Sequence, residues 1–193
     1  TNMTSFVAGN CDTSNVTSMT LMFRDCANLT ALDVSGFDTA NVTNMYAMFY
    51  NCSSITTLDV SGFVTANVTN MSLMFYNCAN LTALDVGGFN TANVTGMGLM
   101  FRSCSSLTDI VGVESFNIEG LNSTGDLDNF AGNVTLPTAR YDALLINWDA
   151  QEPFDGMSPN FGNSKYTAGG AAAAARASLI SNDGWTITDG GTA

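Results

Sequence analysis

A stretch of 26 residues recurs along the chain, and this repetition limits the folds that the chain can adopt. The stretch from Phe37 to Gly62, FDTANVTNMYAMFYNCSSITTLDVSG, is followed by a near copy from Phe63 to Gly88. Another copy precedes it from Cys11 to Gly36, and a drifting copy begins at Phe89. A unit of this length cannot bury its own apolar face, so neighbouring units must stack and share a core. The sequence therefore predicts a solenoid.

Each unit contains a segment with the pattern of a half-buried strand. Leu29, Leu32 and Val34 give the pattern LxxLxV. Alternation of apolar and polar side chains is typical of a strand with one face in the core. We therefore predict about five strands in a parallel sheet. Their centres are Val7, Asp33, Asp59, Asp85 and Val111.

A second apolar segment follows each predicted strand. Its apolar side chains stand at i, i+3, i+4 and i+7, which predicts a short helix or helical turn with one buried face. In one unit they are Met45, Met48, Phe49 and Cys52. The residues just before this segment, 39–43, alternate polar with apolar and predict an extended arm.

Four of the five cysteines occupy one position of the unit. Equivalent positions of stacked units form a column in the core, where a reduced cysteine behaves as a small hydrophobic residue. The chain has no histidine and no CxxC pair, which argues against zinc. The pattern predicts buried free thiols at Cys26, Cys52, Cys78 and Cys104.

The repeat resembles a known family. The pattern FxTxNVTNMxxMFxxCxxLTxLDV is similar to that of bacterial surface leucine-rich repeat proteins of the BspA-like type. The later segments YDALLINWDAQ and GNSKYTAGGAAAAARASLISNDGWTITDGG resemble the part that follows such repeats in large surface proteins. Gly96 and Gly98 depart from the usual pattern. The resemblance implies a right-handed leucine-rich repeat solenoid with a parallel sheet, in an extracellular adhesin on the bacterial cell surface.

The chain divides into repeats and a different C-terminal part. The solenoid is predicted for residues 1–118, because the register slips after Leu107. Residues 119–189 are predicted to form an α/β cap that packs on the last repeat, since solenoids need a terminal element over the last core layer. The cap should contain helices near 137–151 and 171–180. Residues 190–193 are predicted to be a linker.

The composition excludes several functions. Lys plus Arg number 5 against 17 Asp plus Glu, and the net charge of -12 repels nucleic acid and anionic membranes while it favours cations. No apolar run is long enough to span a bilayer, so we expect no membrane insertion. Without histidine, a serine elbow or a glycine-rich phosphate loop, the chain is expected not to be an enzyme.

The first candidate site is a row of aspartates on the outward, concave face of the predicted sheet. Asp33, Asp59 and Asp85 fall on neighbouring strands. Such strands lie about 4.8 Å apart, so the like charges destabilise the sheet unless something compensates them. One interpretation is a binding row for a cationic ligand or for Ca²⁺, which prefers oxygen ligands. The alternative is that each aspartate accepts local hydrogen bonds and recurs because the unit was duplicated.

A second candidate face carries threonine and asparagine in three columns. If the arm is extended, these columns share one outward face, which is similar to the faces of ice-binding solenoids. The alternative is an internal ladder of hydrogen bonds to the backbone. The residues are Thr39, Asn41, Thr43, Thr65, Asn67, Thr69, Thr91, Asn93 and Thr95.

The sequence thus predicts a non-enzymatic adhesion domain that binds a protein, peptide or glycan on its repeat surface. The aspartate row is the first choice of binding face, because solenoids bind along extended concave surfaces. The first alternative is a structural or self-associating spacer that forms a homodimer. The second is an ice-binding solenoid. No cofactor is required, and Ca²⁺ on the aspartate row is the one ion considered.

Overall fold

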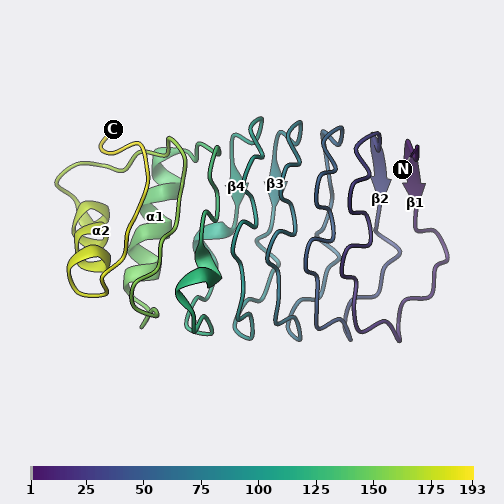
Figure 1. Ribbon diagram of the computed structural model, residues 1–193, viewed down its shortest axis with the longest axis horizontal. Helices are drawn as coiled ribbons and strands as arrows, with labels where there is room; N and C mark the ends of the chain where they lie inside the picture. The colour runs from purple at the N-terminus through teal and green to yellow at the C-terminus, as the bar shows by residue number, and fades with distance from the viewer. Residues whose placement is uncertain (1) are drawn as a thin grey trace.

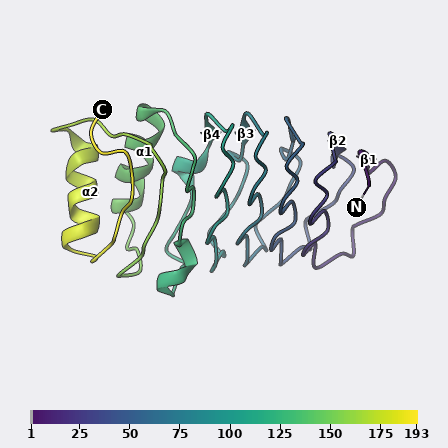
Figure 2. The ribbon, with the colours of Figure 1, turned by 45° about the horizontal axis from the view of Figure 1, so that its top comes forward.

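The computed structural model describes residues 2–193 and places the repeated units side by side in chain order (Figures 1 and 2). The chain has a small mixed α/β fold with short parallel strand pairs and two α-helices. The elements are β1 Ser5–Val7, β2 Ala31–Asp33, β3 Leu84–Asp85, β4 Ile110–Val111, the 3-10 helices η1 Val113–Ser115 and η2 Thr124–Leu127, α1 Thr138–Asp149 and α2 Ala171–Ser181.

The strands form two separate parallel pairs. β1 pairs with β2, which places Phe6 beside Leu32, and β3 pairs with β4. The strand predicted around Asp59 does not form. Within residues 2–193, no backbone hydrogen bond joins residues 57–59 to β2 or to β3. The prediction of five paired strands is therefore wrong at this unit, which carries Ile55 where the other units have leucine.

Of the predicted short helix or helical turn, the second apolar segment forms consecutive turns and no helix. The backbone is left-handed at Ala47, with φ of 52°, and at Asn51, with φ of 58°. Alternate amides donate to the next unit: the Ala47 N–H bonds the Ser72 carbonyl at 3.0 Å, and the Phe49 N–H bonds the Met74 carbonyl at 2.9 Å. The turns bury the same apolar side chains that a helix would bury. Their alternate amides bond to the next unit, whereas the amides of a helix bond within the helix. We call this network the turn ladder; it comprises residues 18–25, 44–51, 70–77 and 96–103.

Strand and turn-ladder side chains meet in one core. The ring of Phe6 in β1 packs edge-on against the ring of Phe23 in the turn ladder, with centroids 5.1 Å apart. The strands and the turn ladder are therefore two faces of the stack with the core between them. Phenylalanines of the ladder stack in a column with ring centroids 5.5 to 5.7 Å apart. The column consists of Phe23, Phe49, Phe75 and Phe101.

The predicted column of free thiols is confirmed. Cys26, Cys52, Cys78 and Cys104 are buried and free, whereas Cys11 is exposed. The thiols also link units, since the Cys78 Sγ donates to the Phe49 carbonyl of the preceding unit at 3.2 Å. Burial raises the pKa of Cys52 and of Cys104 to about 12, so these thiols stay neutral at physiological pH.

Hydrogen bonds of the turn ladder continue across the predicted boundary at residue 118. The Phe101 N–H donates to the Phe130 carbonyl at 2.8 Å, and the Ala131 N–H donates to the Asn160 carbonyl at 2.9 Å. In the following layer, the Phe161 N–H donates to the Thr188 carbonyl at 2.8 Å. Three C-terminal segments therefore extend the stack, in addition to the helices that the sequence predicted there.

The remaining C-terminal residues pack against these added layers. Arg140 of α1 bonds Asp109, beside β4, at 2.9 Å, which attaches the helix to the repeats. Residues 190–193 were predicted to be a linker, but they bond to residues 164–166. The Tyr166 N–H, for example, donates to the Gly191 carbonyl at 3.1 Å. The predicted helices correspond to α1 and α2 within a few residues.

Candidate functional site

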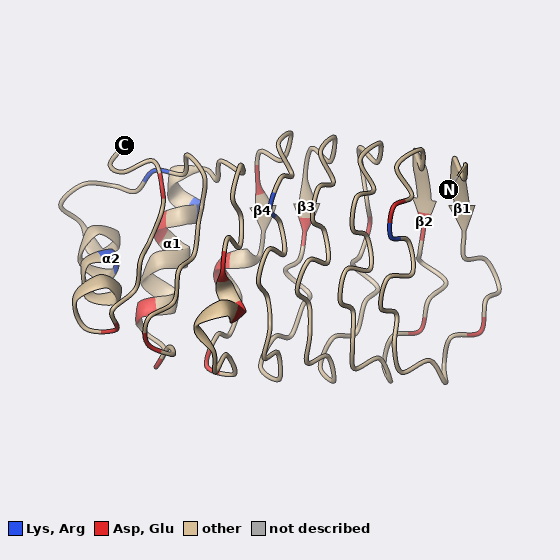
Figure 3. Cartoon of the chain, in the orientation of Figure 1, with Lys and Arg blue, Asp and Glu red and all other residues tan. Residues whose placement is uncertain are grey.

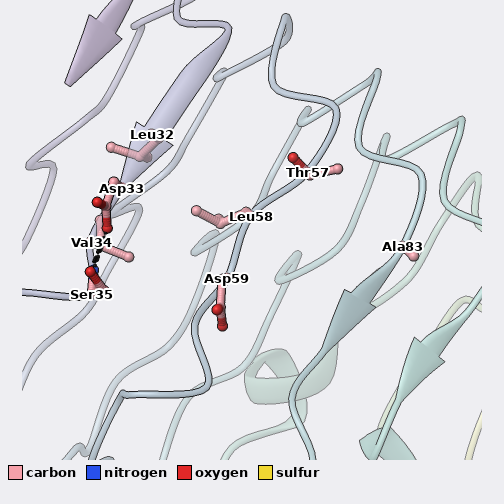
Figure 4. A pocket seen from close by; sticks show the side chains of 8 residues that line it. All are labelled: Leu32, Asp33, Val34, Ser35, Thr57, Leu58, Asp59 and Ala83. Carbon is pink, nitrogen blue, oxygen red and sulfur yellow. Dashed lines mark hydrogen bonds between the residues drawn. The ribbon is translucent and has the colours of Figure 1, made fainter. Parts of the chain in front are cut away.

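The interruption of the sheet leaves a cleft beside two of the three predicted aspartates (Figure 4). The cleft has a volume of about 370 Å³ and is lined by β2, by residues 57–59 and by Ala83. Asp33 and Asp59 lie in its wall, whereas Asp85 of β3 does not line it. The structure therefore brings together two members of the predicted row. We call this the aspartate cleft.

Backbone groups in the aspartate cleft lack partners. In the described chain, the N–H and C=O groups of Thr57, Leu58 and Asp59 make no hydrogen bond to any other residue. The corresponding groups of the neighbouring units are used in the pairs β1–β2 and β3–β4. A backbone group without a protein partner requires water or a ligand. The cleft thus offers donors and acceptors next to two carboxylates.

Each aspartate of the row accepts a hydrogen bond from the amide two residues on. Asp33 Oδ1 accepts from the Ser35 N–H at 2.9 Å and from its hydroxyl at 2.6 Å, and Asp59 Oδ1 accepts from the Ser61 N–H at 2.9 Å. Asp85 accepts the equivalent bond at 2.9 Å. These local bonds agree with the alternative interpretation of the row. Among residues 2–193 the Oδ2 atoms accept no hydrogen bond, so they remain available to a ligand.

The local hydrogen bonds also control ionisation. The serine hydroxyl and amide lower the pKa of Asp33, and those of Ser61 lower the pKa of Asp59. The negative charge of Asp59 raises the pKa of Asp33, but this effect is smaller than that of the hydrogen bonds. Both aspartates therefore carry their charge at neutral pH, and the repulsion expected between neighbouring units is present.

The described residues do not assemble a multidentate metal site. Among residues 2–193, no group of three or more His, Cys, Asp or Glu side chains is placed to hold a metal ion. Ca²⁺ takes about six to eight oxygen ligands. Binding of Ca²⁺ by Asp33, Asp59 and Asp85 therefore stays a sequence-based hypothesis to which the structure adds no further side-chain ligand.

The threonine and asparagine columns use their polar groups to join units. The Thr39 hydroxyl donates to the Val64 carbonyl at 3.1 Å and accepts from the Val64 N–H at 2.8 Å. Asn41 Nδ2 and the Thr43 hydroxyl donate to carbonyls of the preceding unit at 2.7 and 3.1 Å. This is the internal ladder that was the alternative to an ice-binding face.

The same bonds recur in the next two units, and the first column is buried. The residues are Thr65, Asn67, Thr69, Thr91, Asn93 and Thr95. Thr39, Thr65 and Thr91 expose at most 2 % of their surface. The expectation that all three columns share one outward face is therefore wrong for this column, because its hydroxyls bridge backbone groups inside the stack.

A groove that the sequence did not predict runs along the turn ladder. It has a volume of about 300 Å³ and lies between arginine and tyrosine side chains. The Tyr50 and Tyr76 rings stack with centroids 4.8 Å apart, and the Arg24 guanidinium lies 5.2 Å from the centroid of the Tyr50 ring. Arg102 continues this column in the next unit. We call this the Arg–Tyr groove.

The Arg–Tyr groove has a signal in the sequence. Arg24, Tyr50, Tyr76 and Arg102 occupy one position of the unit, at intervals of 26 residues, directly after the buried phenylalanine. This position is exposed at Arg24 and partly buried in the other three units, so the apolar pattern of the core does not include it. The signal that identifies it is a non-core unit position that holds an aromatic or cationic residue in every copy.

Comparison with known proteins assigns the repeats to a family. No helix in residues 2–193 has the length and apolarity that crossing a membrane requires. No curated protein and no solved structure matches the chain. A family model matches residues 2–127, which is more than half of the 193 residues. The chain therefore belongs to the family described as "Mycoplasma protein of unknown function, DUF285".

Proposed function

We propose that the chain is a non-enzymatic ligand-binding module of a bacterial surface adhesin, built as a right-handed leucine-rich repeat solenoid of the BspA-like type. Three features support the proposed architecture: the 26-residue unit with its LxxLxV segment, the parallel strand pairs and the turn ladder that joins successive units. An extracellular position on the cell surface is part of the same proposal. Solenoids of this kind bind ligands along an extended face of the stack.

The aspartate cleft is the observation that carries the proposed function. Asp33 and Asp59 each present an Oδ2 atom without a partner among the described residues, and the backbone of residues 57–59 is unpaired there. A ligand that satisfies both features needs cationic groups together with backbone-like donors and acceptors. An extended peptide segment with lysine or arginine side chains has these groups. We therefore propose such a segment of a partner protein as the ligand.

Removal of the two cleft charges tests this proposal. The probe is a fluorescent peptide, Gly-Lys-Gly-Lys-Gly, titrated in low salt and followed by fluorescence anisotropy. We expect the double variant Asp33→Asn, Asp59→Asn to bind at least about tenfold more weakly, since each charged contact contributes about 1 kcal/mol or more. The fold should be retained, because both side chains are exposed.

Asp12 and Asp38 provide a matched control. Each is exposed and accepts a hydrogen bond from the amide two residues on, at 3.1 and 3.0 Å, but neither lines the aspartate cleft. Asp12→Asn with Asp38→Asn removes the same total charge and should change the affinity less than about twofold. Equal losses in the two double variants would show that only the net charge matters and would overturn the proposal. Unchanged binding in the cleft variant would overturn it as well.

A further inference from the structure

The Arg–Tyr groove concentrates residue types that are rare in the rest of the chain. Three of the five tyrosines and two of the five Lys and Arg residues line it. The net charge is -12, so a general attraction for anions does not explain two arginines at one groove. Tyrosine and arginine dominate the energetics of protein–protein binding sites. This composition is that of a docking site and not of an average acidic surface.

Leucines hold a costly backbone conformation under the groove. The turn ladder has two left-handed positions in each unit. One holds Asp25, Asn51, Asn77 and Ser103, and the other holds Leu21, Ala47, Leu73 and Leu99. Asparagine and aspartate tolerate this conformation, whereas leucine adopts it at a cost. Because the leucine side chains line the groove, they supply its apolar floor.

The outer atoms of the groove are polar, and most of them have no partner among residues 2–193. The hydroxyls of Tyr46, Tyr50 and Tyr76 make no hydrogen bond in the part of the chain that the structure describes, and Arg102 has no ion pair there. Arg24 lies 3.2 Å from the exposed carboxylate of Asp25. One face of the Tyr50 ring is covered by Arg24 and the other by Tyr76. Ring stacking on a sugar is therefore blocked at Tyr50, while its edge and hydroxyl stay free.

The spacing of the two arginines defines the length of a ligand. They are separated by three steps of the stack, and one step is about 4.8 Å, as for neighbouring strands, so their backbones lie about 14 Å apart. An extended peptide covers this length in about four residues. Each guanidinium can hold one carboxylate through two parallel hydrogen bonds. A peptide with carboxylates at positions i and i+4 and an apolar side chain at i+2, on the same face of the extended segment, fits both ends and the floor.

We propose that the Arg–Tyr groove docks an extended acidic segment of a partner protein, with one carboxylate at Arg24, one at Arg102 and an apolar side chain between them over the leucines. This site is distinct from the aspartate cleft, because the two lie on opposite sides of the core and select opposite charges. Long polyanions are poor ligands, since the charge of -12 repels what extends beyond the groove.

A short dicarboxylate peptide tests the proposal on the whole chain. The probe is fluorescent Asp-Ala-Leu-Ala-Asp, whose central leucine faces the same side as the two carboxylates, and its analogue is Asn-Ala-Leu-Ala-Asn. We expect saturable binding of the probe and at least tenfold weaker binding of the analogue. The double variant Arg24→Gln, Arg102→Gln should also lose at least tenfold. The affinity of the variant Arg24→Lys, Arg102→Lys for the probe should lie between those of the unaltered chain and the glutamine variant, because lysine keeps the charge but not the paired hydrogen bonds.

Two controls separate this site from other causes. Lys165→Gln removes an exposed charge outside the groove and should change the affinity less than twofold. The cleft variant Asp33→Asn, Asp59→Asn should bind the acidic probe no more weakly than the unaltered chain does. Equal loss in Lys165→Gln, or equal binding of probe and analogue, would overturn the proposal. Tighter binding of a heparin oligosaccharide than of the probe would also overturn it, in favour of a polyanion site. Circular dichroism of each variant verifies that the fold is retained.

Discussion

The two faces of the stack come from the same repeat but differ in how the backbone is used. On the turn ladder, alternate amides of every unit bond to the next unit, and the C-terminal segments continue these bonds as far as Phe161. On the strand face, pairing stops on both sides of residues 57–59. Figure 3 shows acidic segments on β2 and β3 of the strand face. The ladder face carries Arg24 and Arg102.

This difference indicates which face supports the stack. A continuous hydrogen-bond network together with the phenylalanine column makes the turn ladder the structural scaffold. The strand face contributes fewer bonds, and it can therefore open to a ligand at small cost. The leucine-rich segment is the feature that the sequence makes most visible, yet the structure relies more on the turns. The predictions below test this contrast, beginning with the largest expected effect.

Truncation of a core side chain should cost more on the ladder face than on the strand face. Phe75 is fully buried between Phe49 and Phe101, with ring centroids 5.5 Å away on both sides. Phe75→Ala should lower the free energy of unfolding by about 4 kcal/mol. Leu58→Ala, beside the cleft, should cost about 2 kcal/mol, because its surroundings can collapse. Urea denaturation measures both, and a greater cost for Leu58→Ala would reverse the comparison.

The buried threonine column should matter more than the exposed one. The Thr65 hydroxyl donates to the Asn90 carbonyl at 3.0 Å and accepts from its N–H at 2.7 Å. Thr65→Val keeps the shape but leaves both groups unpaired, so stability should fall by about 2 kcal/mol. Thr69→Val, in the exposed column, should cost less than about 1 kcal/mol. Similar losses of stability for the two variants in urea would mean that burial of the threonine hydroxyl is unimportant.

Relief of backbone strain should separate folding from docking on the ladder face. Leu73 has a φ of 61°, and Leu73→Asn places a more tolerant residue there. Stability should rise by about 0.5 kcal/mol or stay constant. Binding of the acidic probe peptide should weaken, because the groove loses apolar floor. A clear loss of stability in thermal or urea unfolding would show that Leu73 serves the fold and not a ligand.

A pH titration should distinguish the aspartate cleft from an ordinary acidic surface. The pKa of Asp33 and of Asp59 is lowered in the folded chain, so their hydrogen bonds stabilise the fold above the usual aspartate pKa. This stabilisation is lost as pH falls through the lowered values. Binding of the lysine peptide should persist below pH 4 and vanish at lower pH. Loss of binding with a midpoint above the ordinary value of about 3.9 would contradict the local bonds.

The burial of side chains could be predicted from the sequence better than the backbone could. The repeat period identified the buried cysteines, the positions of β1 to β4 and the core phenylalanines, because equivalent residues of stacked units share one environment. The spacing of Met45, Met48 and Phe49 predicted a short helix or helical turn, but consecutive turns with left-handed residues bury the same positions. Side-chain periodicity alone does not distinguish these two backbones.

The candidate sites depended on features that the period hides. Asp59 lies in the same pattern as Asp33 and Asp85, so the sequence gives no sign that its strand is unpaired. Thr39 is polar, which predicts exposure, but its hydroxyl bonds the N–H and the carbonyl of Val64 inside the stack. The Arg–Tyr groove has a sequence signal in the 26-residue spacing of Arg24, Tyr50, Tyr76 and Arg102, but the residue type at this position changes between units, unlike the constant core positions.

Amide hydrogen exchange of the whole chain tests the contrast between the two faces most directly. The amides of Ala47 and Phe49 are bonded to the next unit, whereas those of Thr57, Leu58 and Asp59 are not bonded in the described chain. We expect exchange of the first group to be slower by about a hundredfold or more, since bonded amides exchange only through opening. The lysine peptide should slow exchange in the second group alone. Equal protection of the two groups without ligand would contradict an open strand face supported by a continuous turn ladder.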